Sequence, residues 1–202
     1  MTARYYFSGI GIACCFTLLL SCGEKQHDNP TRFTKIDSLT ETYLMLQDSM
    51  LESWNIMIND DNQKLDAMDN ILHELIVSVA TDPELLKTYQ ERLGQLRRLR
   101  YTQKTMANND VVEEYDFASN ALIAELIAQA ESQKQFAYNP TLQKLADEIR
   151  VADQRVAGYR EQYDEVASRY NIFLEANRKF LKEMDSDSFL DKKPLFQMVA
   201  EE

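Results

Sequence analysis

The chain has 202 residues, of which 45% are hydrophobic and 27% are charged, enough for one domain with a substantial core. Its 33 acidic residues outnumber its 22 Lys and Arg residues, and the net charge is -11. This balance argues against a nucleic-acid-binding protein, because neutralising phosphates requires cationic side chains. Only Gly94 and Gly158 lie beyond the N-terminal region, so glycine-rich phosphate-binding loops are also excluded.

The N-terminal stretch has the pattern of a secretory signal. Arg4 precedes a short apolar run that ends in Leu19-Leu20-Ser21-Cys22 and is too short for a stable membrane span. This ending resembles the lipobox of bacterial lipoproteins. The resemblance implies that residues 1–21 are a lipoprotein signal peptide and that Cys22 receives fatty acyl chains such as palmitate. The alternative is an uncleaved N-terminal anchor helix; both place the domain outside the cytoplasmic membrane, lipid-anchored or helix-anchored in the cell envelope.

Cleavage before Cys22 would leave no thiol for a disulfide, a catalytic site or a metal site, because Cys14 and Cys15 depart with the signal. The loss of Arg4 would leave 21 positive and 33 negative groups, a net charge of -12. Residues 22–31 are polar and show no hydrophobic periodicity, so we interpret them as a lipidated tether.

A first helix is expected to begin near Thr31, because apolar residues recur at helical spacing from Ile36 to Val79. The phase of this pattern continues through the polar patch Asn59-Asp60-Asp61-Asn62. We therefore predict one long helix, in which the patch is a candidate bend, with two shorter helices as the alternative.

The next two helices are marked by their capping residues. Asp82-Pro83 supplies an N-cap and a first helical residue, and the second helix is expected to run to about Met106. Asp110 and Glu113 resemble a capping box that opens a third helix, which is expected to end near Ala137.

The fourth helix is the longest. Asn139 is its expected N-cap and Pro140 its first residue. From Leu142 to Met184, apolar or aromatic residues recur every three or four positions and form one continuous seam. Asn177 is the polar exception. It either lies buried and sets the register against a partner, or it is solvated where the helix diverges from the bundle.

Short connections force consecutive helices to run antiparallel. The pattern therefore predicts an all-α fold, an antiparallel up-and-down four-helix bundle with long first and last helices. We expect the bundle to occupy residues 32–185 and a C-terminal tail to occupy residues 186–202.

A set of residues in the bundle and the tail carries a family resemblance: Trp54, Asp66, Asn70, Asp153, Val156, Arg160, Tyr163-Asp164, Tyr170-Asn171 and Lys193-Pro194-Leu195-Phe196. In this order they resemble the LemA family of membrane-anchored bacterial helical proteins. Asp69 replaces the proline of the family pattern, and Asp164 replaces its first asparagine. The resemblance implies a helical bundle, an extracytoplasmic orientation and no established catalytic activity.

Known catalytic and metal-binding patterns are missing from the predicted domain. His73 is its only histidine, so a di-iron bundle site, which needs two Glu-x-x-His pairs, is excluded. Asp185-Ser186-Asp187-Ser188 resembles the start of a calcium loop, but Phe189 and Leu190 occupy the next ligand and glycine positions. We therefore predict no enzymatic activity, no catalytic residues, no metal and no cofactor.

Arg97, Arg100 and Lys104 form a basic face on the second helix. One interpretation is a solvated face that pairs with acidic neighbours such as Glu113 and Glu114. The other is an interaction face for anionic lipid headgroups or for an acidic patch on a partner.

Two functions remain open at this point. The first is a non-enzymatic scaffold or adaptor that is held at the membrane by the lipid on Cys22 and binds other envelope proteins. The alternative is an envelope chaperone or carrier that binds clients or apolar ligands in a groove between helices. The sequence leaves open the oligomeric state, the partner, and whether the inner or the outer membrane holds the anchor.

Overall fold

A computed structural model describes residues 35–77, 82–184 and 190–196 of the chain. The expected signal peptide 1–21, the tether 22–31 with Cys22, and the run Asp185–Ser188 lie outside the described residues. Within them, the regular secondary structure is entirely helical, and none of the helices carries an apolar stretch that could span a lipid bilayer.

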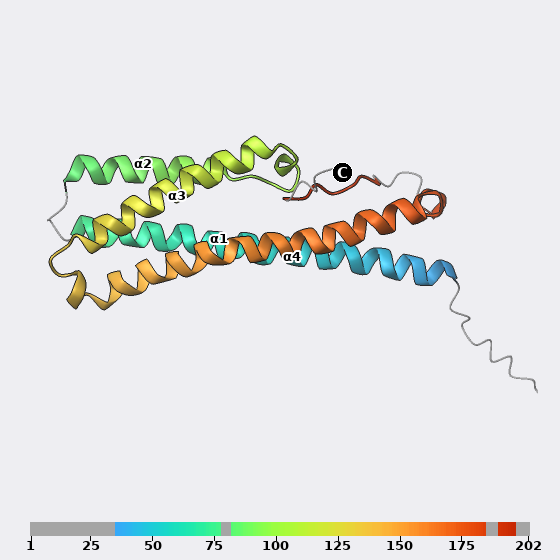
Figure 1. Ribbon diagram of the computed structural model, residues 1–202, viewed down its shortest axis with the longest axis horizontal. Helices are drawn as coiled ribbons and strands as arrows, with labels where there is room; N and C mark the ends of the chain where they lie inside the picture. Colours follow the sequence, from blue (N-terminus) through green and yellow to red (C-terminus); the bar gives the residue numbers. More distant parts are fainter. Residues whose placement is uncertain (1–34, 78–81, 185–189, 197–202) are drawn as a thin grey trace, which may run out of the picture.

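Two long antiparallel helices form the backbone of the fold (Figure 1). Helix α1 spans Lys35–Val77 and helix α4 spans Pro140–Met184, and each is about 65 Å long. The helix α1 is continuous, so the prediction of one long helix is confirmed. Its polar patch does not break it, because Asp60 accepts a hydrogen bond from Arg155 and so stabilises the pair α1–α4.

Helix α2 spans Pro83–Leu99 and begins as predicted, since Asp82 caps it by accepting the Glu84 N–H at 3.1 Å. The prediction that it runs to Met106 is wrong. Arg100 is extended, with φ -55° and ψ 130°, and the turn lets Tyr101 bury its ring in the bundle. Met106 lies in a short 3-10 helix, η1, that spans Thr105–Ala107.

Helix α3 spans Asn109–Glu131, and both of its predicted ends need correction. Its N-cap is Asn108 rather than Asp110: the Asn108 side chain accepts the Asp110 N–H at 3.1 Å. The carboxylate of Asp110 sits instead in the first turn, where the helix dipole favours negative charge. The helix ends six residues before the predicted Ala137, because Gln133 turns inward and is buried.

The short 3-10 helix η2, Phe136–Tyr138, leads into α4. The predicted cap of α4 is confirmed, since Asn139 Oδ1 accepts the N–H groups of Thr141 and Leu142, each at 3.1 Å. Pro140 is the first residue of the helix, as expected.

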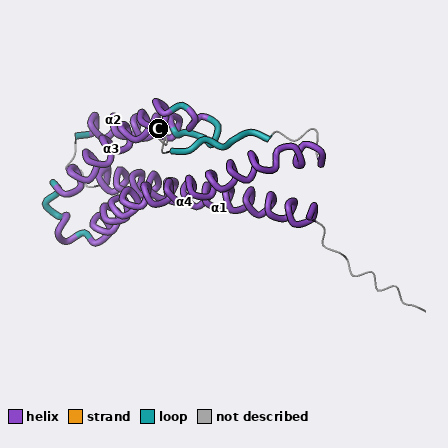
Figure 2. Tube along the Cα trace, turned by 45° about the vertical axis from the view of Figure 1, so that its right-hand side comes forward, coloured by secondary structure: helices purple, strands orange, loops and turns teal. Residues whose placement is uncertain are grey.

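The helices form the predicted up-and-down bundle, but α2 and α3 are much shorter than α1 and α4. They cover only the part of the pair α1–α4 that lies near the end of α1 and the start of α4 (Figure 1). Beyond them, the C-terminal segment 190–196 runs along the long helices (Figure 2). The protein therefore has a four-helix half and a slender half, which we call the arm, made of the first part of α1, the last part of α4 and this segment.

The predicted seam of α4 is buried from Leu142 to Tyr170 at most of its positions. In the arm it shifts by one residue, and Leu174 and Leu181 take the buried positions. A straight α-helix drifts by about 20° per heptad against a strict 3.5-residue repeat, which moves the apolar stripe in this direction. Asn177 is consequently half-buried and donates to the Phe173 carbonyl of its own helix at 2.9 Å, so the buried, register-setting alternative is wrong.

Candidate functional site

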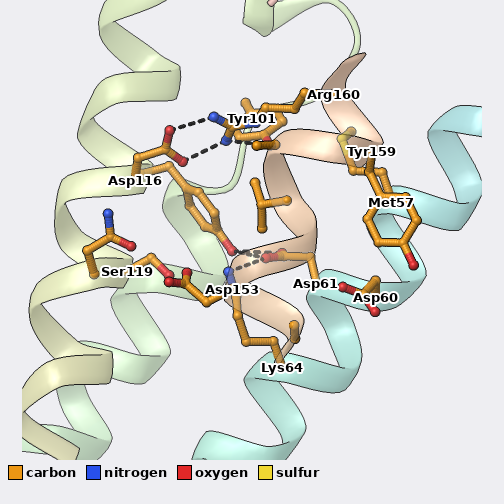
Figure 3. A pocket seen from close by; sticks show the side chains of 15 residues that line it. Met57, Asp60, Asp61, Lys64, Tyr101, Asp116, Ser119, Asp153, Tyr159 and Arg160 are labelled. Atoms are coloured by element: carbon orange, nitrogen blue, oxygen red, sulfur yellow. Dashed lines mark hydrogen bonds and ion pairs between the residues drawn. The ribbon is translucent and has the colours of Figure 1, made fainter. Parts of the chain in front are cut away.

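A cavity of about 230 Å³ lies between α1, α3 and α4, beside the chain that leaves α2 (Figure 3). We call it the central cavity. Four carboxylates and two cations line it: Asp60, Asp61, Asp116, Asp153, Lys64 and Arg160. The tyrosines Tyr101, Tyr115 and Tyr159 complete much of the wall. On three helices, charged side chains thus lie on faces that otherwise carry core residues.

A bidentate ion pair between Arg160 and Asp116 forms part of the wall of the central cavity. The guanidinium of Arg160 donates to both oxygens of Asp116, each at 2.7 Å, and to the Tyr101 hydroxyl at 3.0 Å (Figure 3). Burial alone would lower the pKa of Arg160, but the bonds to Asp116 raise it above its ordinary value. Arg160 is therefore a fixed cation, and it also lies 4.9 Å from the centre of the Phe196 ring.

A second polar cluster forms around Asp61. Its carboxylate accepts the Tyr115 hydroxyl at 2.7 and 2.8 Å and pairs with Lys64 at 3.2 Å and with Arg100 at 3.4 Å. Burial, together with the nearby Asp61 carboxylate, raises the pKa of Tyr115. The tyrosine therefore stays a neutral donor, and Asp61 joins α1 to α3 and to the end of α2.

Ser119 and Asp153, both on the cavity wall, have no partner within the described structure. The Ser119 hydroxyl on α3 belongs to a residue that is only 2% exposed, yet it makes no hydrogen bond. Asp153 on α4 is half-buried and forms neither an ion pair nor a hydrogen bond, whereas Asp60, Asp61 and Asp116 each have a cationic partner. In Figure 3 the side chains of Ser119 and Asp153 converge from α3 and α4.

Among the described residues, no group of three or more His, Cys, Asp or Glu side chains is placed to hold a metal ion. The carboxylate of Asp153 and the hydroxyl of Ser119 both accept hydrogen bonds, so together they suit a donor that enters from outside the chain.

The basic face predicted on α2 is largely engaged within the protein. Arg97 pairs with Asp66 at 3.1 Å, and Arg100 bonds to Asp61 and Asn62, all of them on α1. Glu113 and Glu114, named as possible partners from the sequence, do not take part in these pairs. Lys104 is exposed in the turn after α2 rather than on the helix.

The side of α1 that points away from the bundle carries a second candidate site, which we call the outer face of α1. It consists of exposed residues at helical spacing: Asp37, Glu41, Leu44, Met45, Asp48, Leu51, Glu52, Asn55, Ile56 and Asn59. Four of them are large and apolar and are 45–58% exposed. Four are carboxylates, and none is a Lys or Arg. Most of this face lies in the arm.

Sequence reasoning missed both sites, although each leaves a signal. On α1, the core positions Leu46, Met50 and Met57 have a second apolar stripe out of phase with them, which includes Leu44 and Leu51. For the central cavity, the signal is the pair Asp60 and Lys64, whose charges fall at core spacing.

The C-terminal segment brings together residues on which the LemA resemblance rests. The Phe196 N–H donates to Asp164 at 2.8 Å, and the Lys193 backbone bonds to the Asn171 side chain. Comparison with protein-family models, with curated proteins and with solved structures found no match to this chain.

Proposed function

We propose that this protein is a lipid-anchored, extracytoplasmic adaptor of the bacterial cell envelope, without enzymatic activity. In this proposal, the outer face of α1 docks a basic amphipathic helix of another envelope protein. The observation that carries it is the composition of that face: large apolar side chains and carboxylates in one stripe, with no cation among them.

The outer face of α1 exposes a cluster of large apolar side chains. Single exposed apolar residues are normal on a protein surface, but clusters mark interaction sites. Leu44, Met45, Leu51 and Ile56 are each about half exposed and succeed one another along three turns of α1. A helix that lies across such a stripe is a known mode of recognition, in which apolar anchors recur every three or four residues.

The carboxylates of the outer face of α1 determine which charge a partner helix must carry. Asp37, Glu41, Asp48 and Glu52 flank the apolar residues, so an acidic helix would be repelled and a Lys- or Arg-rich helix attracted. The chain as a whole is also acidic, which adds long-range attraction for a basic partner.

The anchor supplies the location. If Cys22 carries the lipid, only twelve residues separate it from Lys35, the first described residue of α1. An extended chain of this length spans at most about 45 Å. The free end of the arm would then be the end closest to the membrane, so the partner helix is expected to lie near the membrane surface.

The LemA resemblance belongs to this proposal. It rests on the residues of the chain. The hydrogen bonds that Asp164 accepts from Phe196 and that Asn171 exchanges with Lys193 support it, because they join its α4 motifs to its C-terminal motif. A groove of about 800 Å³ between α1 and α4 bears on the carrier alternative. Its wall includes Asp66, Asp147 and Arg155, which suits polar molecules better than apolar ones.

A pair of designed peptides tests the docking chemistry. The mature-length chain, kept free of lipid by Cys22→Ser, is titrated with an amphipathic Lys/Leu helix and with its Glu/Leu counterpart. We expect the Lys/Leu peptide to bind at micromolar concentration and the Asp48→Lys/Glu52→Lys variant to weaken it at least tenfold.

The control is Glu114→Lys/Glu161→Lys, which reverses the same number of exposed charges on α3 and α4. It should reduce binding far less, because its charges lie off the outer face of α1. Equal loss in the two variants would show that net charge alone attracts the peptide, and the docking proposal would then be wrong.

A further inference from the structure

We infer that the central cavity is a binding site for a small organic cation, a primary amine that places its ammonium group between Asp153 and Ser119. This inference is independent of the adaptor function, because the cavity lies between α1, α3 and α4 and uses none of the residues of the outer face of α1.

The Ser119 hydroxyl has no hydrogen-bond partner among the described residues. Buried hydroxyls in folded proteins almost always have a hydrogen-bond partner, since an unpaired one loses its water without compensation. Ser119 lines the cavity and is 2% exposed, and no residue of the described chain supplies a partner for its Oγ. A group that enters the cavity could supply it.

The charges in the cavity indicate that the missing partner of Ser119 and Asp153 is a cation. Three of the four cavity carboxylates are neutralised from within: Asp116 by Arg160, Asp60 by Arg155, and Asp61 by Lys64 and Arg100. Asp153 has no cationic partner among the described residues. A carboxylate acceptor and a hydroxyl acceptor side by side match an ammonium group, which has three donors and no acceptor.

The volume and the wall of the central cavity suit a small organic cation. A volume of about 230 Å³ corresponds to about eight water molecules at roughly 30 Å³ each, below the usual size of drug-like ligand sites. The tyrosine rings in the wall, Tyr101, Tyr115 and Tyr159, suit the aliphatic part of an alkylamine and attract cations. A metal ion fits poorly, because no three metal ligands lie together in the described part of the chain.

Two probes of equal size test the inference by amide chemical-shift titration of the mature-length Cys22→Ser chain. The cationic probe is 4-amino-1-butanol and the neutral probe is 1,4-butanediol. We expect the amine to shift resonances of cavity residues on α1, α3 and α4 in a saturable manner, and the diol to bind at least tenfold more weakly.

The variants assign the contact. Asp153→Asn should weaken amine binding at least tenfold, Ser119→Ala should weaken it severalfold, and Glu161→Gln, an exposed change on the same helix, should leave it unaltered. The amide spectrum of each variant shows whether the fold is retained. Equal binding of the amine and the diol would overturn the inference. So would undiminished binding to a folded Asp153→Asn variant, or an absence of shifts in the cavity, which would mean that the cavity holds only water.

Discussion

Asn171 holds the main chain of Lys193 through a pair of hydrogen bonds, one from the Asn171 amide to the Lys193 carbonyl at 2.8 Å and one from the Lys193 N–H to the Asn171 oxygen at 2.7 Å. Two turns earlier on α4, Asp164 accepts the Phe196 N–H at 2.8 Å. Two polar side chains of one helix thus satisfy the backbone of an extended segment, which would otherwise bury unpaired groups.

Removing this double hydrogen bond should loosen the C-terminal segment. Asn171→Ala is expected to lower the free energy of unfolding by about 1–3 kcal/mol, because it leaves two half-buried backbone groups of Lys193 unpaired. Ile172→Ala, at a neighbouring position that is 67% exposed, is the matched control and should cost far less. Urea unfolding measures both. Trypsin cleavage after Lys192 should become faster in Asn171→Ala alone, and equal rates in the two variants would contradict this role.

Two buried tyrosine hydroxyls should respond in opposite ways to removal. Tyr115→Phe takes away a donor to the Asp61 carboxylate and is expected to destabilise the protein by about 1–3 kcal/mol. Tyr163→Phe removes a hydroxyl that is buried without a partner among the described residues, so its effect should lie between neutral and about 1 kcal/mol of stabilisation. Thermal unfolding of the two variants checks the contrast, and a larger loss from Tyr163→Phe would refute it.

Alkaline pH should destabilise the bundle through ionisation of Tyr163. Burial raises the pKa of Tyr163 to about 12 from an ordinary value of 10.0. A raised pKa means that the folded state holds the proton more tightly. The stabilisation is therefore complete below pH 10 and is lost as the pH rises from 10 to about 12. In Tyr163→Phe, the alkaline unfolding midpoint should move to higher pH, and an unchanged midpoint would contradict the assignment.

The lipid anchor has a direct test of its own. Cys22→Ala should abolish labelling by fatty acids and leave an unprocessed precursor, because acylation and cleavage both depend on that thiol in the predicted lipobox. Labelling with an alkyne fatty acid, followed by mass determination, measures both outcomes. Unchanged labelling would rule out the lipoprotein assignment, and a precursor of full length in the unaltered protein would favour the anchor helix.

The sequence predicted the helices better than it predicted their ends. The caps Asp82 and Asn139 are predicted correctly, because capping is local chemistry. At α3 the prediction chose Asp110, whereas Asn108, two residues earlier, is the cap. The ends of α2 and α3 were placed too late, because they are decided by the burial of Tyr101 and Gln133 against other helices. No local pattern contains that information.

The side-chain pairs around the central cavity could not be predicted from the sequence. Arg155 and Asp60 are 95 residues apart, and Tyr115 and Asp61 are 54 apart, so their pairing becomes visible only in the fold. The sequence suggested Glu113 and Glu114 as partners of the arginines on α2, whereas the nearest carboxylates belong to Asp61 and Asp66 on α1. Helix packing, which sets these distances, is not encoded in the spacing along one helix.

Photo-crosslinking in intact membranes tests the adaptor proposal most directly. A photoreactive side chain at Leu51, on the outer face of α1, is compared with one at Phe117, which is 79% exposed on α3. We predict that Leu51 yields one reproducible crosslinked protein, that Asp48→Lys/Glu52→Lys abolishes this product, and that Phe117 yields no such product. Equal crosslinking from the two positions, no product from Leu51, or a product that survives the charge reversal would contradict docking on the outer face of α1.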